Sequence, residues 1–122
     1  FRFFQKMIAF RKCHPSLSRS RFWRDDVAWY GTDRPVDFSA GSKQLAFVLH
    51  GATEQDVDIY VLINFGVGGV RFGLHEGDSG EWKRVIDTSR ASPADICDPG
   101  EEVPLRSHYC YVESRSVVVL IR

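Results

Sequence analysis

The chain has 122 residues, of which 43% are hydrophobic, and its 16 basic side chains equal its 16 acidic ones in number. This length suits one domain with its own core, and the composition excludes disordered, collagen-like and low-complexity proteins. No apolar run approaches the roughly 20 residues that span a bilayer, so we expect no membrane partner.

The first predicted element is an amphipathic helix close to the N-terminus. Apolar residues recur there at spacings of three and four, which places them on one broad helix face. Pro15 ends the helix, because the residue before a proline avoids helical geometry. A helix of about three turns needs an apolar surface to cover. Its apolar residues are Phe3, Phe4, Met7, Ile8 and Phe10.

The basic residues are concentrated in the same segment. Residues 1–24 contain seven basic side chains and no acidic one, whereas the rest of the chain has 9 basic and 16 acidic residues, a net charge of −7. A basic arm suits nucleic acid or an anionic membrane. The alternative is a charged helix face that meets an acidic neighbour outside this chain. No nucleic-acid-binding motif accompanies the arm, so we expect no nucleic-acid partner.

From about residue 27 the apolar pattern changes to a period of two, which is typical of strands. The run 57–65 is apolar on both faces, which predicts a central strand buried on both sides. We expect the last two runs to pair through a tight turn at 113–116. Short strands with Gly-rich turns predict an all-β fold, an antiparallel β-sandwich preceded by one N-terminal amphipathic helix. The other strand runs are 45–49, 70–74, 82–86, 109–112 and 117–121.

A loop of about 20 residues separates Thr88 from His108 and contains three prolines. Loops of this length in a compact domain are usually functional or packed against another domain. We expect one of these two roles.

One short string resembles the nucleophile segment of trypsin-like serine proteases. Gly77–Gly80 reads Gly-Asp-Ser-Gly, and His50 and Asp56 precede it in the matching order. However, the string lies between two strand runs, where Gly, Asp and Ser favour a hairpin turn. The chain is also too short for the two barrels of such a protease. We interpret the string as a turn and assign no catalytic residue.

Metal ligation is the next candidate chemistry. A structural zinc site needs four ligands, usually in closely spaced pairs, and here only His108 and Cys110 share a face of a predicted strand. The odd number of cysteines indicates reduced thiols in an intracellular protein. We therefore expect no metal site and no cofactor. The candidate ligands are Cys13, His14, His75, Cys97, His108 and Cys110.

Aromatic side chains are candidates for stacking on sugar rings. The three tryptophans are Trp23, Trp29 and Trp82. Large aromatics otherwise fill a core or an inter-domain seam, and we expect Trp82, at the start of a strand, to be packed. Trp29 and Tyr30, beside Gly31, are the candidate substrate-binding residues.

Seven segments of the chain together carry a resemblance to a known family. They are Met7–Leu17, Asp26–Gly31, Asp37–Ser39, Gln44–Gly51, Ile59–Asn64, Trp82–Thr88 and Arg115–Leu120. In this order they resemble the end of isoamylase-type debranching enzymes, which belong to the α-amylase superfamily of glycoside hydrolases, and the resemblance is weakest in the 90–108 loop. The resemblance implies that residues 1–17 are the last helix of a truncated catalytic (β/α)8 barrel, and that 18–122 form a C-terminal β-sandwich domain.

The resemblance also implies a function for the parent protein. Such enzymes hydrolyse α-1,6-glucosidic branch linkages in glycogen or starch, with carboxylates at the C-terminal ends of the barrel strands. None of those motifs occurs here, so no residue of this chain inherits a catalytic role. The implied partners are the chain's own catalytic barrel and the α-glucan substrate of the parent enzyme. The implied compartment is the cytoplasm, or the plastid in a plant.

Two other interpretations stay open, an independent carbohydrate-binding module and an immunoglobulin-like interaction domain. The N-terminal helix favours the debranching-enzyme interpretation over these two, because a truncated barrel leaves such a helix and a free-standing module has no use for it. The first residue, Phe1, is not Met, which indicates a fragment or a processed product. We expect such a fragment to self-associate through the exposed helix, or to fray it.

Overall fold

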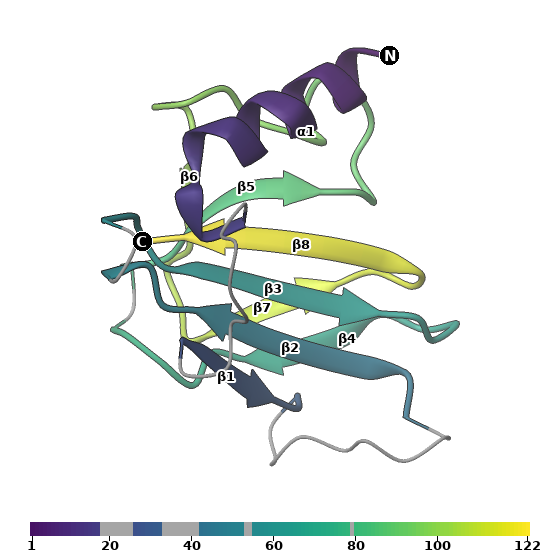
Figure 1. The fold of residues 1–122 in the computed structure, drawn as a ribbon. Coiled ribbons are helices and arrows are strands. Elements are labelled where there is room, and N and C mark those ends of the chain that lie inside the picture. The colour runs from purple at the N-terminus through teal and green to yellow at the C-terminus, as the bar shows by residue number, and fades with distance from the viewer. Residues whose placement is uncertain (18–25, 33–41, 53–54, 79) are drawn as a thin grey trace.

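The computed structural model of the chain describes residues 1–17, 26–32, 42–52, 55–78 and 80–122. They form one six-stranded sheet, in the order β1-β2-β3-β8-β5-β6, and one two-stranded sheet, β4-β7, and every strand pair is antiparallel (Figure 1). The predicted fold class is confirmed. The elements are α1 (Arg2–Cys13), η1 (Pro15–Leu17), β1 (Val27–Tyr30), β2 (Gln44–Leu49), β3 (Ile59–Asn64), β4 (Val70–Gly73), β5 (Lys83–Asp87), β6 (Val103–Pro104), β7 (Tyr109–Val112) and β8 (Ser116–Ile121).

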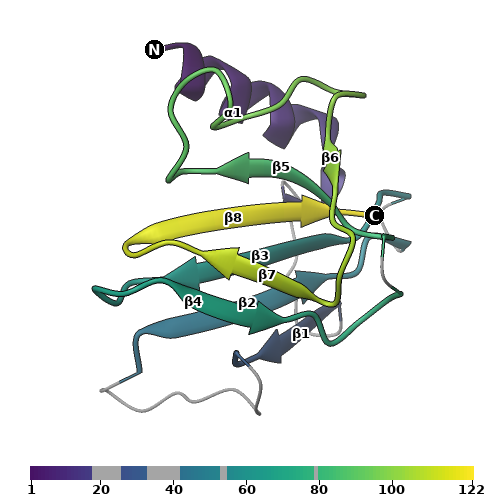
Figure 2. The same ribbon diagram turned by 180° about the vertical axis from the view of Figure 1, so that it is seen from behind.

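The six-stranded sheet is covered on both faces. The β4–β7 sheet lies on one face and α1 on the other (Figure 2). β3 is central, and its residues Ile59, Tyr60 and Leu62 are fully buried, which confirms the predicted burial on both sides. The core between the sheets contains Ala46, Val48, Tyr60, Leu62, Phe72, Trp82, Cys110, Val112, Val118 and Leu120. The core beneath α1 contains Leu49, Ile59, Val85, Ile86, Ile96 and Val119.

The helix ends where the sequence predicts. His14, just before Pro15, has extended backbone angles of φ −122° and ψ 94°, and the chain continues as the short η1. In the described residues no helix is both long enough and apolar enough to span a membrane.

A β-bulge in β5 explains why two consecutive residues face the same core. Arg84 pairs with Leu120 and Ile86 with Val119, so Val85 is the extra residue. Without the bulge, strand alternation would turn either Val85 or Ile86 away from α1. Both side chains instead join the core beneath the helix.

The predicted pairing of the last two strands is wrong. β7 pairs with β4, whereas β8 lies between β3 and β5, so the turn at 113–116 crosses from one sheet to the other. The buried Asn64 amide stabilises this crossing, because its Nδ2 donates to the carbonyl oxygens of Val112 (3.2 Å) and Glu113 (3.1 Å). The segment 74–82 also joins the two sheets, so the expected hairpin there is a sheet-to-sheet connection.

The 88–108 loop packs on this chain. It contains β6, which extends the large sheet beyond β5, and Ile96, which forms an isolated bridge with Ile86 and is 2% exposed. Its start is fixed by Asp87, whose carboxylate accepts hydrogen bonds from Ser89 and Arg90. The loop then passes beside α1 (Figure 2).

Candidate functional site

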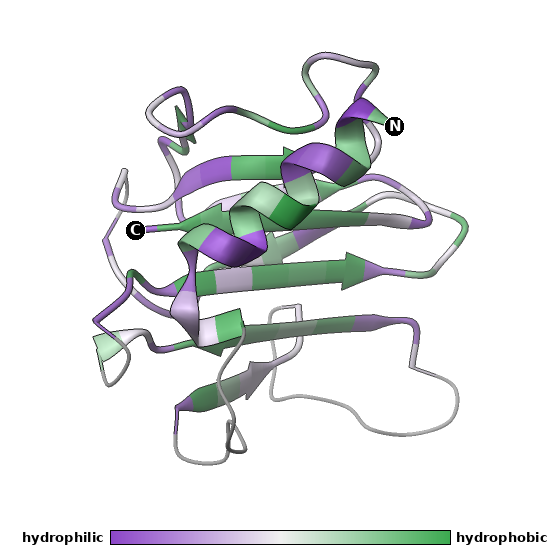
Figure 3. Cartoon of the chain, turned by 45° about the horizontal axis from the view of Figure 1, so that its top comes forward, coloured by the Kyte–Doolittle hydropathy of each residue, from purple (hydrophilic) through white to green (hydrophobic). Residues whose placement is uncertain are grey.

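Among the described residues, the helix α1 packs on the sheet with one side. Phe3 and Phe10 pack against the core beneath α1, together with Leu17 of η1, yet no residue of the helix is fully buried. Figure 3 shows the helix lying across the large sheet, with hydrophobic and hydrophilic residues interspersed on its visible surface. The helix therefore packs on the sheet and stays partly exposed to solvent.

Two ion pairs hold the helix to the 88–108 loop. Arg2 pairs with Asp95, and Lys6 Nζ lies 2.9 Å from Asp98 Oδ1. We expected the positive charges of the N-terminal arm to find their counter-charges in an absent neighbour. For Arg2 and Lys6 that expectation is wrong, because this chain supplies the acids itself. Arg19, Arg21 and Arg24 lie outside the described residues.

A second attachment fixes the end of the helix. Asp56, whose side chain is 5% exposed, lies 2.9 Å from His14 Nδ1 and also accepts a hydrogen bond from the Ser16 backbone N–H at 3.3 Å. The carboxylate thereby satisfies hydrogen-bonding groups at the turn between α1 and η1. Sequence reasoning named both His14 and Asp56 in other roles and missed this contact.

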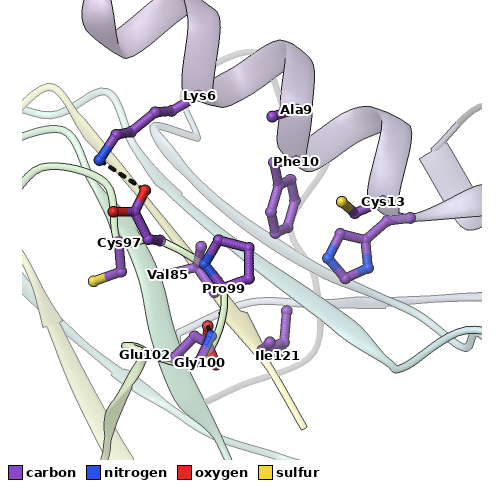
Figure 4. A pocket seen from close by; sticks show the side chains of 12 residues that line it. Lys6, Ala9, Phe10, Cys13, Val85, Cys97, Pro99, Gly100, Glu102 and Ile121 are labelled. Carbon is purple, nitrogen blue, oxygen red and sulfur yellow. Dashed lines mark hydrogen bonds and ion pairs between the residues drawn. The ribbon is translucent and has the colours of Figure 1, made fainter.

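A groove opens between α1 and the loop, with a volume of about 280 Å³. Phe10 projects into it beside Pro99, and the Lys6–Asp98 ion pair lies along its edge (Figure 4). Cys13 and Cys97 line it from opposite sides and do not point toward each other (Figure 4). Both are free thiols. We interpret this groove as an incompletely packed contact between α1 and the loop.

A second groove lies on the other side of the helix and is almost wholly apolar, with a volume of about 420 Å³. Phe4 and Ile8 border it and are 70% and 57% exposed. The sheet contributes Ile59, Val61 and Val119 to its floor. With one charged side chain, Arg11, among its lining residues, it offers no acid–base pair for catalysis and suits an apolar contact.

A polar cluster closes one end of the sandwich around Glu76. Its carboxylate accepts a hydrogen bond from the Tyr30 hydroxyl at 2.7 Å and lies 2.7 Å from His50 Nε2. Burial, and next the hydrogen bond to Glu76, raise the pKa of Tyr30 well above its ordinary value. Arg122 joins the cluster because its Nη2 lies 3.6 Å from Glu76 Oε1 and 2.8 Å from Asp58 Oδ2. The cluster ties β1 and the chain's end to the connection after β4.

These contacts exclude the serine-protease interpretation. His50 contacts Glu76, and Asp56 contacts His14, so the two candidates bind different partners. Gly77 and Gly80 have φ of 77° and 88°, the left-handed conformation that favours glycine in turns. Ser79 lies outside the described residues.

The candidate metal ligands do not converge. The described part of the chain contains no group of three His, Cys, Asp or Glu side chains able to hold a metal ion. His75 Nε2 lies 3.0 Å from the Thr32 carbonyl oxygen, and His108 is exposed. Cys110 is in the core, where burial raises the pKa of its thiol to about 11.

The two candidate substrate-binding residues face opposite sides of the sheet. They are consecutive in β1, so Trp29 lies against Phe47 with ring centroids 5.3 Å apart, whereas Tyr30 packs toward the core between the sheets. They therefore do not form one stacking surface, although either ring alone remains a predicted site. Trp82 is 1% exposed, as expected for a packed residue. Trp23 falls outside the described residues.

The chain is similar to known proteins over most of its length. The family described as "Isoamylase 1-3, C-terminal" matches residues 28–118. The rice protein "Isoamylase 3, chloroplastic" (Oryza sativa subsp. japonica) is 36% identical over 102 residues, which are 82% of this chain. "Isoamylase" of Pseudomonas amyloderamosa is 33% identical over 96 residues, 72% of this chain. The matched region covers 12% of each of these longer relatives.

Proposed function

The chain belongs to the isoamylase 1–3 C-terminal family, and on this premise we propose that it is the C-terminal accessory domain of an α-1,6-glucan debranching hydrolase. In this proposal residues 18–122 form the accessory β-sandwich, and residues 1–17 are the last helix of the catalytic barrel. The substrate of the parent enzyme is a branched α-glucan. The role of the domain is to stabilise the barrel by covering its last helix.

The observation that carries the proposal is the division of the apolar surface of α1. Phe3 and Phe10 pack on the sheet, whereas Phe4 and Ile8 stay largely exposed beside an apolar groove. Fully burying a large apolar side chain is worth about 1.5–3 kcal/mol. This division is what we expect of a helix that lies between two domains, with one side packed on the sandwich and the other side packed on a second domain.

The described carboxylates support a structural role for the domain. Asp56, Asp58, Glu76 and Asp87 all hold His, Arg or Tyr side chains of this chain. A glycosidase needs two carboxyl groups facing each other across a bound sugar. We therefore expect this chain alone to release no reducing ends from amylopectin or glycogen above a buffer blank.

The test uses the whole protein whose reading frame contains this chain. We expect the sequence upstream of Phe1 to encode a (β/α)8 barrel with three catalytic carboxylates, and the purified protein to debranch amylopectin. Deleting residues 18–122 should then lower the midpoint of thermal unfolding and the debranching activity together. An upstream sequence without a barrel, or a truncated protein of unchanged stability, would contradict the proposal.

A further inference from the structure

The outer face of the β4–β7 sheet carries two exposed aromatic rings. Tyr109 and Tyr111 are two residues apart in β7, so they share this face, and they are 44% and 56% exposed. Between them Cys110 turns inward to the core. Along an antiparallel strand this spacing places the Cβ atoms of the two tyrosines about 7 Å apart.

The positions beside the rings on β4 hold the rings in place and leave part of each exposed. Gly73 pairs with Tyr109 and Arg71 with Tyr111, so a residue without a side chain faces the first ring. The Arg71 guanidinium lies 4.3 Å from the centre of the Tyr109 ring. Tyr111 leans over Gly69, where an added Cβ would collide with its phenol group. Both tyrosines are thus held by neighbouring groups with part of each ring open to solvent.

This face, hereafter the tyrosine face (Arg71, Tyr109 and Tyr111), points away from α1. The helix and the tyrosine face lie on opposite sides of the six-stranded sheet (Figure 2). If the catalytic barrel adjoins α1, as proposed above, the tyrosine face stays accessible in the parent enzyme.

We propose that the tyrosine face binds a linear segment of α-glucan. A pyranose ring has an apolar face of C–H groups and a rim of hydroxyls. Tyrosine rings pack against the apolar face of the sugar. The phenol groups and the Arg71 guanidinium can form hydrogen bonds with its hydroxyls. An exposed face with two neighbouring rings suits a polymer that continues past both ends. The choice of α-glucan as the polymer rests on the proposed function.

The surface chemistry favours a sugar over a protein partner. Its exposed aromatic groups are phenols beside a guanidinium, whereas Cys110 and Val112 are turned inward into the core. An obligate interface with a second copy would instead present a large apolar area, like a domain core cut in half. Self-association through this face is tested as a separate outcome below.

The test is a titration of the 15N-labelled chain with maltoheptaose, followed by NMR. We expect saturable shifts at residues 69–73 and 109–111, with a dissociation constant of about 1 mM. Tyr109→Ala and Tyr111→Ala should each weaken binding about tenfold, and the double variant should abolish it. Both side chains are exposed, so an unchanged thermal midpoint will show that the variants are folded.

Two adjacent glycines provide a matched pair of variants. Gly69→Ala should displace the Tyr111 ring and weaken maltoheptaose binding, whereas Gly68→Ala should have no effect, because nothing lies within 4 Å of its added Cβ. Neither glycine has a positive φ, so alanine is tolerated by both backbones. The ring that Gly69→Ala displaces is the end of a flexible side chain, so the fold should be kept.

The outcomes separate this inference from the proposed function. No binding by the unaltered chain, shifts centred on Trp29, or binding that survives Tyr109→Ala/Tyr111→Ala would overturn the inference. So would tyrosine-dependent dimerisation in analytical ultracentrifugation without sugar binding. If such a failure accompanied a parent protein that debranches amylopectin, the proposed function would stand. Tyrosine-dependent binding by a chain whose parent does not debranch would support the tyrosine face and contradict the proposed function.

Discussion

At the scale of single residues, Asn64 makes five side-chain hydrogen bonds within the described part of the chain. It is fully buried at the end of β3, and its amide nitrogen donates to the carbonyl oxygens of Gly68, Val112 and Glu113. Its Oδ1 accepts from the Gly66 backbone N–H and from Gln44. One side chain therefore joins both sheet-to-sheet turns at this end of the sandwich.

We expect Asn64→Asp to be strongly destabilising. The substitution replaces the amide donor by a carboxylate that faces three carbonyl oxygens, and an uncompensated buried charge costs about 3–5 kcal/mol. Gln44→Ala is the control, because it removes one hydrogen bond to Asn64 and should cost about 1 kcal/mol. Urea unfolding at pH 7 measures both. Equal losses for the two variants would show that Asn64 is not the central contact.

The cysteines should differ in reactivity. Cys110 is 6% exposed and burial raises its pKa to about 11, so at pH 8 its thiol is protonated and covered. Cys13 is exposed. Iodoacetamide at pH 8, followed by mass mapping, should label Cys13 in the native chain and Cys110 only after denaturation. Labelling of both at the same rate would mean that β7 opens readily.

The same pKa shift gives a sign for the pH dependence of stability. The unfolded state loses the Cys110 proton near pH 9, whereas the folded state keeps it to about pH 11. The unfolded state then binds fewer protons, so the free energy of unfolding falls as pH rises through this window. Comparing unmodified chain with Cys110→Ala between pH 8 and 11 isolates the effect, since the variant should lose less stability over that range. An equal loss of stability in the unmodified chain and in Cys110→Ala would contradict this effect of the Cys110 thiol.

Sequence patterns predicted the positions of residues well where burial alone determines them. They predicted poorly the residues whose role depends on a hydrogen-bond partner far away in the sequence. Trp82 was expected in the core and is there, because a large aromatic at a strand start has few other stable positions. Asp56 and Glu76 were not predicted as anchors. Their partners, His14 and Tyr30, are 42 and 46 residues away, and only tertiary folding brings them together. Asn64, polar within an apolar run, was the visible signal that was missed.

At the scale of elements, periodicity located the helix and the strands β2, β3, β4, β5, β7 and β8. It predicted neither β1 nor β6 as a strand run, and it did not predict which strands pair. The last two strands were expected to pair because a tight turn joins them. Both edges of β8 are occupied by β3 and β5, however, so β7 must pair elsewhere. Alternation shows which residues of a strand share a face, and it carries no information on which strand lies beside it.

The attachment of α1 can be tested at one residue of its inner side. Phe10 packs on the core beneath α1 and also contacts the His14 ring, with centroids 4.3 Å apart. We expect Phe10→Ala to detach the helix while the sheets stay folded, at a cost of about 2–3 kcal/mol for the partly buried ring. Amide exchange should accelerate across 2–13 and stay slow in β3 and β8. Equal acceleration throughout would show that helix and sheets unfold as one unit.

At the scale of the whole molecule, the described residues form a layered structure in which α1 keeps part of its apolar surface exposed. The two sheets enclose a closed core, whereas the core beneath α1 is covered by a helix that keeps Phe4, Met7 and Ile8 exposed. These apolar side chains border the larger groove. Exposed apolar patches of this kind drive association when their natural partner is missing.

We therefore expect the isolated chain to self-associate through α1, or to fray this helix. Phe4→Gln with Ile8→Gln should improve solubility and lower the sedimentation coefficient without melting the β-core, since neither side chain belongs to a buried cluster. Phe1→Gln is the control, because Phe1 is 93% exposed and lies outside the groove. In the full parent protein the sign should reverse. If the proposed barrel adjoins α1, the same two substitutions would remove contacts with it and should lower the thermal midpoint. A monomeric chain whose helix is fully protected from amide exchange would contradict the idea, and would show that the sandwich alone supplies the docking surface for α1.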